Sequence, residues 1–439
     1  MYARIECEGT RIKVQVGSAE GGSDIVNWDF TDSTFASKGC FWLMNYQMMD
    51  LRFDYFNYSP PSTGMQGVVR DSLGNTIAGA AVSTSTGGYS TTSGAGGVYS
   101  ITGMDPATYS ATASKANYNS QTVDDIIVST GSMTTVDFTI TDATPPTTPV
   151  VTDDGAYQTS SDSVRFSWSS SDPESGVEGY RYAVSKTTSM LDIIPGGDWL
   201  EVGTSTTHTR TGLSLANGQT YYGLVRARNP LLAVSEIGVS DGIKVAKAVP
   251  SIAQAKAEPD GTMVALEGRP VTASFTDCIY VEDPDRTSGI KVDATGIAEG
   301  ALVDLVGYLS MVDGERRISG YSVTVVGAGQ PPEALALGNA VLGGGSLDPY
   351  TPGVTGGVGL HNIGLLVATW GKVESAGSGY FVIEDGSGAG LQVAAPAGVS
   401  LPSPAQYVVV TGISSCESSG PQIIRLLRVR SQADIHVVQ

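Results

Sequence analysis

The sequence predicts an all-β protein that is divided into several small domains. Short runs in which every second residue is apolar alternate with turn-forming residues, and glycine alone contributes 55 of the 439 residues. No long stretch of sequence carries the 3.6-residue apolar period of a helix. Because a single core seldom grows past about 250 residues, this length implies three or more domains. We therefore expect a string of small β-sandwiches followed by two small β-barrels.

The charge of the chain restricts its partners. The sequence holds 25 basic and 44 acidic residues, a formal net charge of −19. The phosphate backbone of nucleic acid and anionic membrane surfaces would be repelled by this charge. No run approaches the roughly 18 consecutive apolar residues of a membrane-spanning helix. Nucleic acid is thus an unfavourable partner, and we expect no membrane insertion.

The N-terminal sequence predicts a strand rather than an export signal. Tyr2 to Val16 alternates in polarity and carries several charges, unlike the apolar core of a signal peptide. We expect upstream sequence with an export signal to be missing; the alternative is a leaderless cytoplasmic protein. Cys7 and Cys40 fall in neighbouring predicted strands and form a candidate disulfide, whereas Cys278 and Cys416 fall in different domains. The cysteines leave the redox compartment undecided.

Residues 1–58 are predicted to hold only four strands, at 2–8, 11–16, 39–46 and 51–58. These strands are too few for a complete domain. The turn Glu8 to Thr10, the stretch Asp32 to Gly39 and the closing Phe53 to Tyr58 resemble the last third of a concanavalin-like (laminin-G type) jelly roll. Such jelly rolls in bacteria often sit in glycan-binding or glycan-degrading proteins. The earlier strands that form the face are absent, so no sugar site is carried over.

Residues 62–141 contain short strands separated by glycine turns, including Gly67 to Asp71, Ile77 to Val82 and Gly97 to Ile101. The whole segment closely resembles the carboxypeptidase regulatory-like domain, a small transthyretin-like sandwich. Alternation predicts an inward-facing core. Its members are Val68, Val82, Tyr99, Ile101 and Phe138. The resemblance implies a rigid spacer or adhesive module without chemistry.

A Pro-Thr linker, Thr144 to Pro149, separates that segment from residues 150–246. The second segment contains Val164 to Trp168 and Thr220 to Ala227, and it resembles a fibronectin type III-like domain. In such sandwiches a tryptophan fills the core and a corner tyrosine bonds to upstream backbone. The resemblance assigns these two structural roles to Trp168 and Tyr221.

The last 190 residues contain an internal repeat. Val281 to Val292 aligns with Ile383 to Val393, and each copy has one strand before it and two after it. This order resembles bacterial tandem OB-fold domains of the nucleic-acid-binding type, here residues 250–328 and 329–439. The charges argue against nucleic acid, since the first copy holds six basic and twelve acidic residues and the second holds four and seven.

Five residues of this repeat are candidates for ligand binding: Tyr280, Lys291, Trp370, Tyr380 and Gln392. Alternation along the strands places Tyr280 and Lys291 on the outside of the first barrel, and Tyr380 and Gln392 on the outside of the second. Trp370 is expected at the surface, where it would form a stacking platform with Tyr380 for a sugar or a protein. The alternative is that a neighbouring domain buries this platform.

We expect no catalytic centre in the chain. His208, His361 and His436 are far apart in sequence and form no metal-binding motif. Gly238 to Gly242 matches the G-x-S-x-G pattern, but a nucleophile elbow needs a strand-to-helix turn in an α/β sheet. Neither observation supports an enzyme.

Carboxylates are interpreted as turn residues, and no metal or cofactor is expected. Asp162, Asp172 and Glu174 offer hard oxygen atoms that suit calcium, but they lack the spacing of a calcium loop. Pairs such as Glu282 with Asp283 are expected in simple solvated turns, whereas acid–base catalysis needs a cleft and a raised pKa.

These observations together indicate a non-catalytic, extracellular or cell-surface modular protein that binds a glycan or a protein surface, as in adhesion. A second hypothesis, based on the partial jelly roll, is the C-terminal accessory region of a secreted polysaccharide-active enzyme. A third is a structural subunit of an extracellular fibre or sheath, because edge strands and few charges favour assembly.

Overall fold

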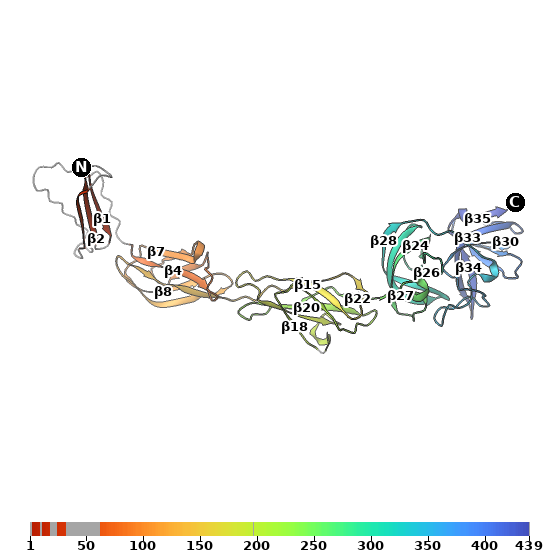
Figure 1. Ribbon diagram of the computed structural model, residues 1–439, viewed down its shortest axis with the longest axis horizontal. Coiled ribbons are helices and arrows are strands. Elements are labelled where there is room, and N and C mark those ends of the chain that lie inside the picture. Colours follow the sequence, from red (N-terminus) through yellow and green to blue (C-terminus); the bar gives the residue numbers. More distant parts are fainter. Residues whose placement is uncertain (1, 9–10, 18–23, 32–61, 196, 439) are drawn as a thin grey trace, which may run out of the picture. The chain divides into compact units, whose positions relative to one another are not determined.

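The computed structural model describes residues 2–8, 11–17, 24–31, 62–195 and 197–438 (Figure 1). Strands dominate these residues, and their one α-helix, α1, spans only Ile252–Lys256. The predicted all-β class is confirmed. Within the same residues no helix is long and apolar enough to cross a membrane. The chain divides into two compact units, and the loops 171–178 and 228–235 belong to the first unit, with residues 1–147.

The first described strands form a three-stranded antiparallel sheet. Its members are β1 (Tyr2–Glu8), β2 (Arg11–Gly17) and β3 (Asp24–Thr31), paired in chain order. The first two match predicted strands, and β3 was not predicted. Cys40 and the predicted strands at 39–46 and 51–58 lie outside the described residues, as does the proposed Cys7–Cys40 pairing.

Residues 64–142 fold as a sandwich of two sheets. One sheet has the order β10-β8-β5-β6, and the other has the order β11-β4-β12-β9 with β7 paired to β4. The strands are β4 (Gly64–Asp71), β5 (Ala81–Thr84), β6 (Ser90–Thr92), β7 (Val98–Thr102), β8 (Ala107–Ser114), β9 (Tyr118–Asn119), β10 (Gln121–Val128), β11 (Met133–Thr135) and β12 (Phe138–Asp142). A 3-10 turn, η1 (Ala95–Gly97), precedes β7.

The core of this sandwich agrees with the predicted residues except at Val68. Four of them are buried: Val82, Tyr99, Ile101 and Phe138. Val68 is only half-buried and its neighbour Val69 is fully buried, because the inward side of β4 carries the odd-numbered residues. A shift of one residue exchanges the two faces of a strand.

The next sandwich begins at residue 148. One sheet has the order β13-β15-β19, and the other has β14-β22-β20-β16-β17 with β18 paired to β16 and β21 paired to β20. The strands are β13 (Val150–Asp153), β14 (Tyr157–Gln158), β15 (Val164–Ser169), β16 (Gly179–Ser185), β17 (Ile193–Ile194), β18 (Leu200–Gly203), β19 (Thr207–Arg210), β20 (Thr220–Arg228), β21 (Gly238–Val239) and β22 (Ile243–Val245). A 3-10 turn, η2 (Met190–Asp192), precedes β17.

Both structural residues predicted in this sandwich take their expected positions. Trp168 is buried and stacks on Tyr182 with a ring separation of 5.5 Å. Tyr221 is fully buried, and its hydroxyl oxygen accepts a 2.8 Å hydrogen bond from the backbone N–H of Ala216, five residues upstream. This bond ties the chain to the start of β20.

Two closed barrels follow, and they share one strand order. In the first, the order β24-β25-β26-β28-β27 is closed because β27 pairs back onto β24, and β23 adds to the outside of β24. Its strands are β23 (Lys247–Ala248), β24 (Met263–Ser274), β25 (Ile279–Glu282), β26 (Gly289–Val292), β27 (Ala301–Val312) and β28 (Glu315–Ala328). Ile279, Val281, Ile290 and Val292, which alternate with Tyr280 and Lys291 along β25 and β26, are all buried in the core of this barrel.

In the second barrel the order β30-β31-β32-β34-β33 is closed by pairing between β33 and β30. Strand β29 adds to β30 and strand β35 adds to β33. The strands are β29 (Leu335–Ala336), β30 (Leu366–Ala376), β31 (Tyr380–Glu384), β32 (Leu391–Ala394), β33 (Tyr407–Ser419), β34 (Gln422–Arg428) and β35 (Ile435–Val438), with 3-10 turns η3 (Asn339–Val341) and η4 (Gln432–Asp434).

Candidate functional site

Tyr280 does not project from a free surface, so its predicted exposure is wrong. Its side chain is 0% exposed and lies in an apolar cluster with Leu366 and Ile413 of the second barrel. Its hydroxyl donates to a carboxylate oxygen of Glu315 at 3.0 Å. Alternation correctly places Tyr280 outside the first barrel, but the second barrel covers that outer face.

Lys291, on the neighbouring strand, is also largely covered, contrary to its prediction. Its side chain is 12% exposed, and its ammonium nitrogen lies 3.8 Å from Asp277 and 4.0 Å from the buried carboxylate of Glu315. The charge of Lys291 therefore balances carboxylates beside the contact between the barrels.

Trp370 and Tyr380 are both exposed, as predicted, but they do not form one platform. The backbone N–H of Gly377 donates to the carbonyl of Tyr380 at 2.8 Å, which places Tyr380 across from the far end of β30. Trp370 lies seven residues earlier on that strand. At about 3.3 Å per residue the two positions are roughly 23 Å apart along the sheet.

The structure gives Trp370 different neighbours, which define a surface that we call the aromatic face. On β33, Val409 lies directly opposite Trp370 and Tyr407 lies opposite Lys372. On β35, His436 and Val438 continue these two rows. The aromatic face consists of Trp370, Lys372, Tyr407, Val409, His436 and Val438.

The aromatic face is apolar where the outside of a barrel is normally polar. Trp370 is 54% exposed and Tyr407 is 53% exposed. Val408 and Val410, which alternate with Tyr407 and Val409 along β33, are buried in the barrel core. The residues on both sides of this strand are therefore apolar, although only one side is needed for the core. Exposed apolar patches of this kind mark interaction sites.

A hollow of about 340 Å³ adjoins the indole of Trp370. Small residues in its lining leave space beside the ring. The hollow is lined by Ala336, Leu337, Gly338, Ala368, Thr369, Trp370 and Val409. The hydroxyl of Thr369 donates to Asn339 at 2.9 Å, which anchors the loop after β29 to β30. The space beside the indole thus has walls that the fold holds in place.

Sequence reasoning identified Trp370 but missed Tyr407 and Val409. Tyr407 to Val410 is apolar at every position, so a period-two pattern that would separate an inner from an outer side is absent there. One signal in the sequence could have identified Tyr407. It is the aromatic residue at the start of β33, the strand that pairs with the strand of Trp370.

Gln392 belongs to a separate groove on another part of the second barrel. The groove has a volume of about 400 Å³ and is also lined by Val382, Gly390, Gln422 and Arg425. The amide of Gln392 donates to Glu417 at 3.3 Å. The five candidate residues therefore do not form one site: two are covered, Trp370 lies on β30, and Tyr380 and Gln392 are diagonal neighbours on the paired strands β31 and β32.

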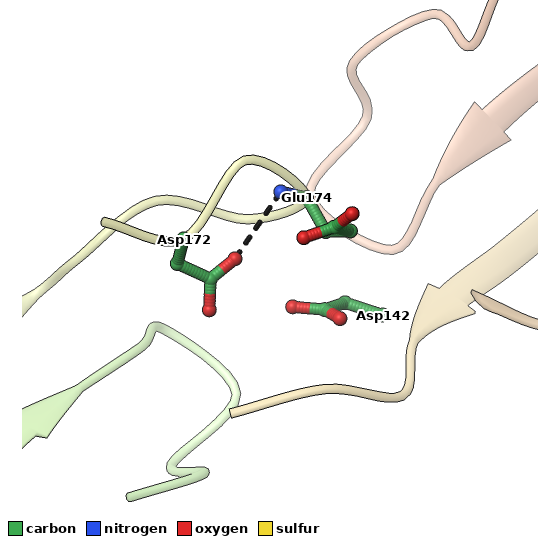
Figure 2. Close-up of side chains that lie close together, drawn as sticks. All are labelled: Asp142, Asp172 and Glu174. Atoms are coloured by element: carbon green, nitrogen blue, oxygen red, sulfur yellow. Dashed lines mark hydrogen bonds between the residues drawn. The ribbon is translucent and has the colours of Figure 1, made fainter. Parts of the chain in front are cut away.

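Three carboxylates in the first unit could hold a hard cation (Figure 2). Asp142, at the end of β12, meets Asp172 and Glu174, and oxygen atoms of the three lie within 4.8 Å of one another. Asp172 caps its own turn, as predicted, by accepting the backbone N–H groups of Glu174 and Ser175 at 3.2 and 2.9 Å. Asp162 is not part of this group and instead accepts a hydrogen bond from Ser160.

Hydrogen bonds already satisfy the two buried carboxylates of this group. The amide of Asn229 donates to both Asp142 and Asp172 at 3.2 Å, and the hydroxyl of Ser175 donates to Asp142 at 2.6 Å. Burial alone would raise the pKa of Asp142, but these bonds and those from Thr144 outweigh it, so its pKa lies below the ordinary value. Sequence reasoning missed Asp142 because only the fold brings it to the Asp172 turn.

The comparisons with known proteins bear on the sandwiches. Residues 64–141 match the family model of the carboxypeptidase regulatory-like domain. This match confirms the prediction for that segment and supports a multidomain all-β protein. No curated protein matches the sequence.

Solved structures with similar β-sandwich modules have low identity to this chain. Fibronectin(III)-like modules of Clostridium thermocellum CbhA are 12% identical, with 44% of this chain and 82% of theirs covered and a TM-score of 0.17. The FN1-FN3 domains of chicken CNTN1 are 10% identical, with 75% and 98% covered and a TM-score of 0.20. A Bacteroides uniformis protein, provisionally described as carbohydrate binding, is 13% identical, with 40% and 97% covered and a TM-score of 0.17.

Proposed function

We propose that this chain is a non-catalytic, modular binding protein of the cell surface or extracellular space, whose aromatic face binds a neutral glycan. The observation that carries the proposal is the pair Trp370 and Tyr407, which are exposed on adjacent strands of one sheet face. Indole and phenol rings combine a broad apolar face with a polar edge, which suits the apolar faces and hydroxyl rims of sugar rings.

The shape of the second barrel supports a small, flat ligand. The hollow beside Trp370 has apolar residues on several sides, and it is also lined by the buried Thr369, whose hydroxyl donates to Asn339. Binding sites for small molecules are commonly apolar with a few polar groups that fix orientation. Trp370 would stack on one ring, and the hollow would receive a neighbouring ring or substituent.

Charge favours a neutral ligand over nucleic acid. Three of the four basic residues of the second barrel are held in ion pairs, and two of these pairs are close: Arg428 lies 3.0 Å from Asp277, and Arg430 lies 2.7 Å from Asp434. Binding to single-stranded nucleic acid needs a basic track along the phosphates. The aromatic face carries one Lys, Lys372, and it lies 3.8 Å from Glu374.

We also propose OB-fold domains at 250–328 and 329–439, a fibronectin type III-like sandwich at 150–246 and the end of a jelly roll at 1–58. The closed five-stranded order of both barrels supports the OB-fold assignment. In this arrangement the sandwiches act as spacers that present the second barrel. The same arrangement would serve an accessory region of a polysaccharide-active enzyme, which is the second candidate function.

A titration of the full chain tests the class of ligand. Binding is measured by tryptophan fluorescence. We expect neutral oligosaccharides to bind and oligo-dT to bind little at about 0.15 M salt. Sub-micromolar binding of oligo-dT that weakens steeply with salt would contradict the proposal, because that behaviour shows that phosphate contacts dominate.

A further inference from the structure

Glu282 of the first barrel holds the backbone of the second barrel. It is the last residue of β25, and its side chain is 0% exposed, so its interpretation as a solvated turn residue is wrong. Its Oε1 accepts a hydrogen bond from the backbone N–H of Leu366, the first residue of β30. A carboxyl group thus lies buried in the contact between two barrels that each have their own core.

The backbones of the two barrels pack closely beside this carboxyl group. A Cβ atom at Gly289, which pairs with Glu282 across the β25–β26 hairpin, would lie 2.2 Å from the carbonyl oxygen of Gly364. A Cβ atom at Gly364 would lie 2.4 Å from the backbone of Gly289. Only glycine fits at either position, so the barrels meet backbone to backbone next to Glu282.

If Glu282 is ionised, its neighbours stabilise the negative charge of its carboxylate only in part. Its second carboxyl oxygen, Oε2, has no hydrogen-bond partner. Arg286 and the buried hydroxyl of Thr272 favour the charge, while Asp283 repels it. Asp283 is itself committed elsewhere, since it pairs with Arg269 at 3.0 Å and accepts the backbone N–H of Ile252. From the second barrel, the group that meets Glu282 is the N–H of Leu366.

We propose that Glu282 is a proton-dependent latch between the two barrels, whose neutral form favours the docked arrangement and whose ionised form weakens it. A neutral carboxyl group retains an oxygen that accepts the Leu366 N–H and carries no charge into the buried contact. Ionisation leaves a charge in that contact with one oxygen unpartnered, which is costly.

The direction of the pH dependence follows from the pKa of Glu282. Burial raises this pKa to about 7, against the opposing effects of the Leu366 hydrogen bond, Arg286 and the Thr272 hydroxyl. The docked state therefore binds more protons than the undocked state between the ordinary pKa of 4.5 and about 7. Docking weakens as pH rises through this range, by a factor of roughly three hundred at most.

Other buried groups near the contact titrate too: burial raises the pKa of Glu315, as it does that of Glu282, and shifts the pKa values of Lys256 and His361 in the opposite direction. Burial lowers the pKa of Lys256 to about 8 and that of His361 to about 3, so each favours its neutral form in the folded chain. His361 makes the folded state less stable as pH falls below its ordinary value of 6.5. The wild-type profile therefore sums opposing effects, and the effect of Glu282 appears in the difference between the wild type and a variant.

The test compares the full-length wild type with Glu282→Gln, a neutral side chain of the same shape. Hydrogen exchange of peptides covering β30, corrected for intrinsic rates, gives protection factors between pH 4.5 and 7.5. We expect the ratio of variant to wild-type protection to rise at least tenfold over this range. Glu267→Gln, which changes an exposed carboxylate on β24, should leave the ratio constant.

A second readout does not depend on the folding of the variant. In the wild type labelled with ¹⁵N-leucine, the Leu366 amide resonance should titrate with a midpoint near neutral pH. A resonance that does not move between pH 4.5 and 8.5 would overturn the latch. A constant protection ratio would overturn it too, even if the resonance titrates, because Glu282 would then ionise without affecting docking.

Discussion

Trp370 lies directly opposite Val409 on the antiparallel strand of the second barrel, and both side chains face solvent. Tyr407, two residues before Val409, points to the same side, within reach of the indole as a diagonal neighbour. An aromatic pair therefore stands on a rigid sheet rather than on a loop. Rigid placement reduces the entropy that binding costs, which favours recognition of a flat ligand.

The corner hydrogen bond of Tyr221 should contribute measurably to the second sandwich. Tyr221→Phe removes the oxygen that accepts the N–H of Ala216 and leaves that donor without this partner. We expect a loss of about 1–2 kcal/mol in the free energy of unfolding, measured by urea denaturation. Tyr222→Phe is the matched control, since Tyr222 is only partly buried. Equal losses in both variants would contradict this role.

Asn229 should be essential for the paired carboxylates in the first unit. Asn229→Ala removes the amide that donates to both Asp142 and Asp172, and it leaves two buried carboxylates facing each other. We expect a loss of about 2–3 kcal/mol, seen as a lower melting temperature at pH 7. Adding Asp142→Asn to this variant should restore part of the loss. A double variant that is no more stable than Asn229→Ala would contradict the explanation.

Acid should weaken the same unit through Asp142. Its pKa is lowered in the folded state, so its contribution to stability is complete above its ordinary pKa of 3.8 and is lost as pH falls through its lower folded pKa. Melting curves of the wild type and Asp142→Asn should therefore converge as the pH falls from about 5 towards 2. A stability difference that stays constant over this range would show that Asp142 contributes no proton linkage.

Tyr280 should stabilise the buried carboxylate of Glu315, which also accepts a hydrogen bond from Ser415 of the second barrel. Tyr280→Phe removes the hydroxyl that donates to this buried carboxylate, whose pKa is already raised by burial. The pKa of Glu315 should rise further, so the variant should lose about 1–2 kcal/mol at pH 7 and less near pH 4.5, where a neutral carboxyl is favoured. Urea denaturation at both pH values measures this. A loss that is larger at pH 4.5 would contradict it.

The sequence predicted the buried residues of single sandwiches better than the residues on the outer faces of the barrels. Trp168 and Tyr221 could be assigned because their roles depend on neighbouring strands of one sandwich. Tyr280 was misplaced because alternation tells which side of a strand a residue occupies but not what covers that side. Asp142 and Tyr407 were missed because their partners, Asp172 and Trp370, lie about 30 or more residues away and are brought to them only by the fold.

Glycan binding by the aromatic face is the central claim, and calorimetric titration of the full chain tests it most directly. A panel of neutral hexasaccharides is titrated into the wild type, Trp370→Ala, Tyr407→Ala and the control Tyr380→Ala. We expect the two face variants to lose at least tenfold in affinity, about 1.4 kcal/mol each, and the control to bind like the wild type. Unchanged binding by Trp370→Ala, or no binding by the wild type to any glycan in the panel, would contradict the account.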